Sequence, residues 1–196
     1  MKITGLILAG GRGSRMGDVD KGLQTFRGQA MVAHVIERLK PQCDELIINA
    51  NRNLDTYAAF GHRVVPDAID GFAGPLAGLH IGMTHAHHPL IVTAPCDSPF
   101  LPLDLVARLC THLEQHQADL AVAKTFDQPH PVFCLVKTSL APHLHDFLAS
   151  GQRKIDKWYA SLKVVQVPFD DNEAAFANIN TATELRAMES TPAPHP

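Results

Sequence analysis

The sequence predicts an α/β protein with a mainly parallel, partly mixed central sheet between layers of helices. The first observation is that apolar runs of strand length alternate with segments of helical period up to about residue 118. Such alternation is typical of βαβ units, in which helices cover both faces of a parallel sheet. The second observation is that two apolar runs then follow each other across a short connection, which predicts a mixed extension of the same sheet.

The elements of the first half follow one another in regular order. The predicted strands are 3–9, 45–50, 62–67 and 89–95. The predicted helices between and after them are 30–40, 54–60, 75–86 and 102–116. Pro41 ends the first helix because proline cannot continue one, and Pro75 lies near a helix start, where a missing N–H costs little.

The second half has two strands, at 119–124 and 131–137, joined by "TFDQPH". Helices at 139–150 and 154–162, a strand at 163–169 and a last helix from Thr181 complete the prediction. No break in composition separates these elements from the first half. We therefore expect one domain over residues 1–190, with the proline-rich residues 191–196 as a flexible tail.

Composition excludes several classes of protein. The 196 residues carry a formal net charge of -3, which argues against a nucleic-acid-binding surface. No run approaches the length of about 18 apolar residues that a membrane helix needs, and the N-terminus lacks the features of a signal peptide. Four scattered cysteines without a C-x-x-C pair fit reduced thiols. We expect a cytoplasmic protein without membrane or nucleic-acid partners.

A glycine-rich loop, "LAGGRGSRMGDVDKG" at 8–22, follows the first predicted strand. Glycines let backbone N–H groups approach a ligand closely, and the cations of the loop favour a phosphate. It does not fit the P-loop, because Asp18 stands after Gly17 where lysine is required. The dinucleotide fingerprint also fails, since Met16 replaces its third glycine and asparagines replace the acidic residue after the second strand.

Arg15 and Lys21 give this loop the charges that a nucleotidyl transfer needs. Cleavage of an α–β phosphoanhydride spreads negative charge over the α-phosphoryl oxygens and the leaving pyrophosphate. Fixed cations and N–H groups at that place stabilise the transition state more than the ground state. A pair of glycines can also simply turn a strand into a helix, but the complete pattern with both cations favours the phosphate interpretation.

Polar residues stand at the ends of three further strands. Asn49 and Asp67 lie at the ends of the second and third predicted strands, and Asp97 follows the fourth, where ligands of open parallel sheets bind. Asp97 is the candidate magnesium ligand, with a helix N-cap as the alternative, although Ser98 and Asp104 are competing caps. Asp67 is equally compatible with a ribose or metal contact and with a turn.

Two other kinds of site find little support. His85, His87 and His88 cluster before Pro89, but no cysteine pair or H-E-x-x-H accompanies them, so a solvated helix end is favoured over zinc. The serines lack the G-x-S-x-G setting of a nucleophile. We therefore expect no covalent catalyst.

The loop resembles the signature loop of the sugar-nucleotide and cofactor nucleotidyltransferases, and the chain is most similar to the molybdenum cofactor guanylyltransferase family. The resemblance also includes "INANRN", "VVPD", "GPLAGLHIGM", "APCDSPF", "QPHPVFCLV", "GQRKIDKW" and "FANINT", in this order. It implies a Rossmann-like three-layer αβα nucleotidyltransferase fold. Ser98 stands where relatives often have threonine, which is a mild departure.

The resemblance also implies a set of site residues. As catalytic residues it implies Arg15, Lys21 and Asp97. As nucleotide-binding residues it implies Leu8, Ala9, Gly10, Lys21, Asn49, Asp67 and Asp97, with Mg2+ on Asp97. On the side of the pterin it implies Gly78, Gly82, Asn178 and Asn180.

The implied reaction is transfer of GMP from GTP to molybdenum-molybdopterin cofactor, which gives the guanine dinucleotide cofactor and diphosphate. The implied partners extend to a molybdenum-insertion protein and to acceptor molybdoenzymes or their chaperones, with a monomer favoured. A cytidylyltransferase using CTP is the alternative within the class. A non-catalytic nucleotide-binding regulatory module is the alternative outside this class of enzymes. Sugar transfer from a nucleotide donor is less favoured, because "CDSPF" lacks the D-x-D metal motif expected there, and the motif occurs only as "DVD" in the first loop.

Overall fold

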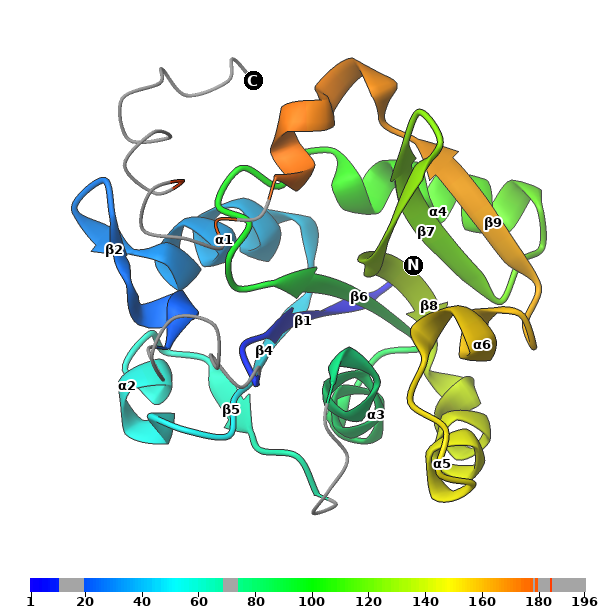
Figure 1. Cartoon of the computed structure of the whole chain (residues 1–196), viewed down its shortest axis with the longest axis horizontal. Coiled ribbons are helices and arrows are strands. Elements are labelled where there is room, and N and C mark those ends of the chain that lie inside the picture. The colour runs from blue at the N-terminus through cyan, green and yellow to red at the C-terminus, as the bar shows by residue number, and fades with distance from the viewer. Residues whose placement is uncertain (11–19, 69–73, 178, 180–183, 185–196) are drawn as a thin grey trace.

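The computed structural model describes residues 1–10, 20–68, 74–177, 179 and 184. In this part of the chain, seven strands form one sheet in the order β5-β4-β1-β6-β8-β7-β9 (Figure 1). Their bounds are β1 Ile3–Leu8, β4 Glu45–Asn49, β5 Arg63–Val65, β6 Leu90–Pro95, β7 Leu120–Thr125, β8 Gln128–Lys137 and β9 Val164–Pro168. β8 is antiparallel to both of its neighbours, and every other pair in the sheet is parallel. The predicted mainly parallel, partly mixed sheet is thus confirmed.

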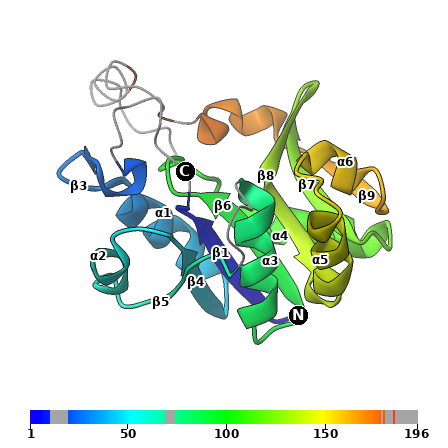
Figure 2. The ribbon, with the colours of Figure 1, turned by 60° about the horizontal axis from the view of Figure 1, so that its bottom comes forward.

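Between residues 20 and 177 of the described chain, six α-helices cover the sheet or flank it. They are α1 Met31–Leu39, α2 Leu54–Ala58, α3 Pro75–His85, α4 Leu105–Gln115, α5 Ala141–Ala149 and α6 Ile155–Tyr159. One apolar cluster joins α1, α2 and α4 to one face, and a second joins α3, α5 and α6 to the other. Figure 1 shows α1 and α4 on one side of the sheet and α3 and α5 on the other, and Figure 2 brings α3 and α5 forward. The three layers follow from strands that are apolar on both sides, as in β6, where all six residues are buried.

The structure differs from the sequence predictions at several boundaries. β8 begins at Gln128, so the connection after β7 is a tight turn at 126–127 rather than a six-residue loop. Phe126 has a φ of 49°, which makes this turn possible. The predicted helix 154–162 shortens to α6, and 139–150 divides into a 3-10 turn, η3 (Thr138–Leu140), followed by α5.

Among the described residues, five short elements were not predicted. The hairpin of β2 (Thr25–Phe26) and β3 (Gln29–Ala30) precedes α1. The 3-10 turns η1 (Lys21–Leu23) and η2 (Lys40–Gln42) and the segment η4 (Asp170–Phe176) are each too short or too irregular to leave a periodic pattern. The predicted helix from Thr181 and the predicted tail at 191–196 lie outside the described residues. None of the helices in the described part of the chain is long and apolar enough to cross a bilayer.

Candidate active site

The carboxyl edge of the sheet brings together the ends of β1, β4 and β6. Leu8 pairs in register with Asn49 on one side and Pro95 on the other. The ladder continues one step further, because Ala9 N donates to Asn49 O at 2.8 Å and Cys96 N donates to Leu8 O at 3.1 Å. Leu8 and Ala9, both predicted to contact the nucleotide through the backbone, therefore lie between the strand ends that carry the other candidate residues.

A polar network connects β4 to the end of β5. Asn49, only 2% exposed, donates through Nδ2 to Val65 O at 3.1 Å and to Asp67 Oδ1 at 2.9 Å. Asn51 Nδ2 donates to Asp67 Oδ2 at 2.8 Å, and Asn51 Oδ1 accepts from Asp67 N at 2.8 Å. Asp67 thus fixes both amides through its two carboxylate oxygens. This explains the aspartate structurally, and a contact with ribose stays a prediction.

Gly10 lies directly against this network. A Cβ at Gly10 would be 2.9 Å from Asn51 Nδ2, closer than real Cβ contacts, and 3.0 Å from Asn49 Oδ1, tighter than most of them. Asn51 Nδ2 is also 3.4 Å from the Gly10 carbonyl oxygen. The first loop therefore begins in contact with the two asparagines, and glycine is required for that approach.

Lys21 and Asp97 form an ion pair across the edge. Lys21 Nζ, at the start of η1, lies 3.5 Å from Asp97 Oδ2, and the two side chains are 25% and 13% exposed. Burial raises the pKa of Asp97 and the nearby ammonium only partly offsets this effect. The structure thus places two of the three predicted catalytic residues in contact, while Arg15 lies outside the described residues.

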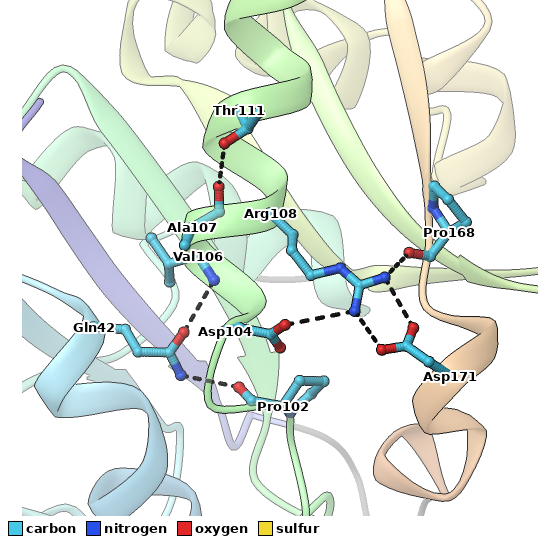
Figure 3. A network of polar contacts seen from close by, with 9 residues as sticks. All are labelled: Gln42, Pro102, Asp104, Val106, Ala107, Arg108, Thr111, Pro168 and Asp171. Atoms are coloured by element: carbon cyan, nitrogen blue, oxygen red, sulfur yellow. Dashed lines mark hydrogen bonds and ion pairs between the residues drawn. The ribbon is translucent and has the colours of Figure 1, made fainter. Parts of the chain in front are cut away.

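The capping alternative for Asp97 is wrong. Helix α4 begins at Leu105 with Asp104 as its N-cap residue, and the Asp104 side chain makes no capping hydrogen bond. Instead, Gln42 Oε1 accepts from Val106 N at 3.0 Å in the first turn of α4 (Figure 3). Asp97 therefore has no part in starting that helix, which leaves its carboxylate for the site.

A residue near the C-terminal end of the chain, Ile179, contacts Asp97. Ile179 N donates to Asp97 O at 3.1 Å, and the Ile179 side chain is buried with Phe26, Met31 and Phe100. This contact brings a residue of "FANINT" to the candidate site. Asn178 and Asn180, predicted to face the pterin, lie outside the described residues, so their position stays a prediction.

Arg108 fastens the segment that leads to Ile179. From α4 it donates to both oxygens of Asp171 at 2.9 Å each and to the carbonyl of Pro168 (Figure 3). Its guanidinium also lies 4.0 Å from the centre of the Phe169 ring. These contacts hold the end of β9 and the start of η4 against α4.

Gly78 and Gly82 lie on the buried side of α3. A Cβ at Gly78 would collide with Asn49 Oδ1 and would lie 2.7 Å from Leu8 Cδ2. At Gly82 it would collide with Leu6 Cδ2, two residues before the end of β1. The close packing of α3 on the sheet accounts for both glycines without a ligand, and their contact with a pterin stays a prediction.

Sequence reasoning missed a group of residues around Lys21. Asp20 accepts hydrogen bonds from the backbone of Gly22 and from the side chains of Asn53 and Tyr57. The sequence distinguishes Asp20 only as the last residue of the "DVD" motif. No sequence signal identifies Tyr57 as its partner, because a lone tyrosine in a short apolar segment resembles any core residue.

The histidines before β6 have local partners. His87 Nδ1 lies 2.7 Å from Glu45 Oε1, and His85 Nδ1 lies 2.9 Å from Arg63 Nη2. Within the described ranges, no group of three or more histidine, cysteine, aspartate or glutamate side chains could hold a metal ion. These contacts agree with the interpretation of this segment as a surface helix end.

Comparison with known proteins places this site in a family. Residues 5–166 match the model of the MobA-like NTP transferase domain. The molybdenum cofactor guanylyltransferase of Bordetella petrii is 54% identical over 190 residues, covering 95% of this chain and 96% of that protein. The corresponding enzyme of Ralstonia nicotianae is 53% identical over 195 residues, covering 95% of each.

A solved structure gives the same result for the fold. The crystal structure of molybdopterin-guanine dinucleotide biosynthesis protein A from Archaeoglobus fulgidus superimposes with a TM-score of 0.79. The two chains are 25% identical, and the alignment covers 95% of this chain and 96% of that one. Together with the match to the family model and the relatives above 50% identity, this likeness shows that the chain belongs to the MobA-like NTP transferase family.

Proposed function

We propose that this protein transfers GMP from GTP to molybdenum-molybdopterin cofactor, giving molybdopterin guanine dinucleotide cofactor and diphosphate. The observation that carries the proposal is the Lys21–Asp97 pair, with 3.5 Å between Nζ and Oδ2, at the carboxyl edge where Asn49 and Asp67 also lie. Relatives above 50% identity along almost the whole chain are named molybdenum cofactor guanylyltransferase, which favours GTP over CTP.

The reaction requires one bond to form and one to break at the α-phosphorus of GTP. An oxygen of the terminal phosphate of the pterin cofactor attacks this phosphorus, and the α–β phosphoanhydride bond breaks, so that pyrophosphate leaves with the bonding electron pair. A phosphate monoester is already an anion near neutral pH, so the attacking oxygen needs no general base. Positioning and charge stabilisation are what the protein must supply.

The described residues divide these tasks. Lys21 provides an ammonium at the edge where the triphosphate would lie, and it opposes the repulsion between two anionic substrates. Leu8, Ala9 and Asn49 are proposed to contact the nucleoside. The Ala9 N–H and the Asn49 Nδ2 hydrogens already donate within the protein, so these contacts would use carbonyl and amide oxygens as acceptors. Arg15 is proposed to add a second cation from the first loop.

Asp97 is the residue that would hold a magnesium ion. Its carboxylate is 13% exposed, burial disfavours its charge, and it faces the place proposed for the phosphates. Mg2+ is usually bound by one or two protein carboxylates, with substrate phosphates and water as the other ligands, so a single aspartate is sufficient. When bound there, the ion would neutralise phosphate charge and orient the triphosphate.

The test compares the four nucleoside triphosphates, each carrying an α-³²P label, with molybdenum-molybdopterin as acceptor. We expect label to pass to the pterin from GTP with release of unlabelled pyrophosphate. Transfer from CTP in preference to GTP would establish the cytidylyl alternative. Nucleotide binding without transfer from any of the four would refute the enzymatic proposal and indicate a regulatory module.

A further inference from the structure

Lys21 stands between two residues that the fold holds in place. Asp20 is the N-cap of η1, and its Oδ1 accepts from Gly22 N at 3.2 Å and from Tyr57 Oη at 2.6 Å. Its second oxygen, Oδ2, accepts from Asn53 Nδ2 at 3.0 Å. The residue before the lysine is therefore bonded on both carboxylate oxygens.

The two side-chain donors come from α2 and from the residue that precedes it. Tyr57 is fully buried in the apolar cluster on one face of the sheet, so its hydroxyl has a fixed position. Asn53 is the N-cap of α2, but its side chain makes no capping hydrogen bond to that helix. Its φ of 53° lies in the left-handed region, and its amide turns to Asp20 instead. The N-cap residue of α2 thus hydrogen-bonds to Asp20 rather than to its own helix.

The residue after the lysine is held by packing. A Cβ at Gly22 would lie 2.5 Å from Tyr57 Oη and 3.2 Å from both Cys96 Cβ and Cys96 Sγ. Gly22 therefore fits between α2 and the chain that follows β6. Because Cys96 immediately precedes Asp97, this packing sets the distance between Lys21 and its carboxylate partner.

We propose that Asp20, Tyr57 and Asn53 form a clamp that positions Lys21 for the transfer reaction. The inference rests on the proposed function and adds three positioning residues, none of which touches the reacting atoms. A lysine side chain has four rotatable bonds and loses much conformational freedom when it is fixed. Anchoring the backbone on either side of Lys21 reduces the volume that its ammonium can sample, which keeps the charge where the leaving pyrophosphate forms.

The chain offers a matched pair of substitutions because it contains two tyrosines. Tyr57→Phe removes the hydroxyl that binds Asp20, at 2.6 Å, and keeps the buried ring. Tyr159, on α6, donates through its hydroxyl to Pro131 O, also at 2.6 Å, and Tyr159→Phe removes this hydroxyl. Each substitution removes one tyrosine hydroxyl that donates to an oxygen at 2.6 Å, from a fully buried ring at Tyr57 and from a half-buried ring at Tyr159. We expect about a tenfold fall in kcat at saturating GTP for Tyr57→Phe alone, an effect on the order of one misplaced catalytic group.

Asn53→Gly serves as a second variant that leaves the core untouched. Glycine tolerates the left-handed conformation of this exposed residue, so the substitution removes the amide donor without backbone strain. We expect kcat to fall in the same direction as for Tyr57→Phe. In a Lys21→Ala background, neither Tyr57→Phe nor Asn53→Gly should lower kcat further, because the clamp acts through the lysine. If Tyr57→Phe or Asn53→Gly lowered kcat in the Lys21→Ala background by the same factor as in the parent protein, the proposal would be overturned.

A measurement without substrates separates the clamp from the proposed function. Acetic anhydride acylates free lysine amines, and mass spectrometry gives the rate at Lys21. Loosening the clamp should break the ion pair with Asp97 more often and raise this rate severalfold in Tyr57→Phe and Asn53→Gly, but not in Tyr159→Phe. If the parent chain transferred no GMP, the proposed function would fail and this rate alone would decide the clamp. An unchanged rate in both clamp variants would overturn the clamp, whatever the activity.

Discussion

Gly78→Ala is expected to weaken GTP binding by displacing an amide from inside the fold. The new methyl would collide with Asn49 Oδ1 and lie 2.7 Å from Leu8 Cδ2. Asn49 cannot withdraw freely, because its Nδ2 donates to Val65 O at 3.1 Å and to Asp67 Oδ1 at 2.9 Å. Overpacking costs about 1–3 kcal/mol and a lost hydrogen bond about 1 kcal/mol, while alanine returns about 1 kcal/mol through helix propensity.

The net destabilisation is therefore about 2 kcal/mol, which lowers Tm by about 4–8 °C in a chain of this length. Differential scanning calorimetry measures that shift, and isothermal titration with GTP measures the affinity. Gly82→Ala is the control, since its methyl would strike the flexible end of Leu6. We expect it to lower Tm as well but to leave GTP affinity close to that of the parent. Unchanged GTP affinity in Gly78→Ala, together with the Tm loss, would refute the link between α3 packing and the nucleotide site.

The remaining predictions concern charges. Lys21→Ala should lower transfer at saturating GTP as well as GTP affinity, with only partial recovery in Lys21→Arg; a normal saturated rate in steady-state kinetics would limit the lysine to binding. Asp97→Asn should lower transfer about 10²-fold. Since burial raises the pKa of Asp97, its carboxyl stabilises the fold when protonated and loses this contribution as the pH rises through that pKa, so Asp97→Asn should match or exceed the parent's Tm at pH 7. A clear Tm loss would contradict this reasoning. Arg108→Met should lower Tm at neutral pH. Because Arg108 lowers the pKa of Asp171, the Tm difference between variant and parent should shrink in melts below about pH 4. A Tm difference that did not change with pH would exclude the ion pair as its cause.

The sequence predicts the fold well because periodicity reports burial directly. β1, β4 and β6 are continuous apolar runs, and their predicted ranges agree with the structure to within one residue at each end. Boundaries fail where tertiary contacts decide them. The turn at 126–127 depends on a left-handed Phe126, which has no glycine or asparagine to signal it. The segment η4 is held by Arg108 from a helix more than 60 residues earlier in the chain, as Figure 3 shows.

The candidate site is predictable to the extent that it follows from strand ends. Asn49 ends a recognisable strand, Asp67 and Asp97 lie just after two others, and parallel pairing brings these ends to one edge. The function of Asp67 as the acceptor for two asparagine amides requires the register of β4 and β5, which single-sequence patterns do not contain. The role of Tyr57 cannot be predicted from the sequence either, because its partner Asp20 lies 37 residues away in the chain.

The ion pair at the centre of the site is not explained by stability. Burial disfavours the charge of Asp97 more strongly than Lys21 favours it, so folding alone would be better served by a neutral side chain there. The surroundings nevertheless hold both partners in place, through the packing of Gly22 against Cys96 and the backbone contact of Ile179 with Asp97. A largely buried carboxylate beside a single ammonium fits the proposed magnesium ion, because the charge of that ion would add to the charge of Lys21. The excess of burial over pairing at Asp97 therefore supports the proposal that a metal ion bound with the nucleotide completes the site.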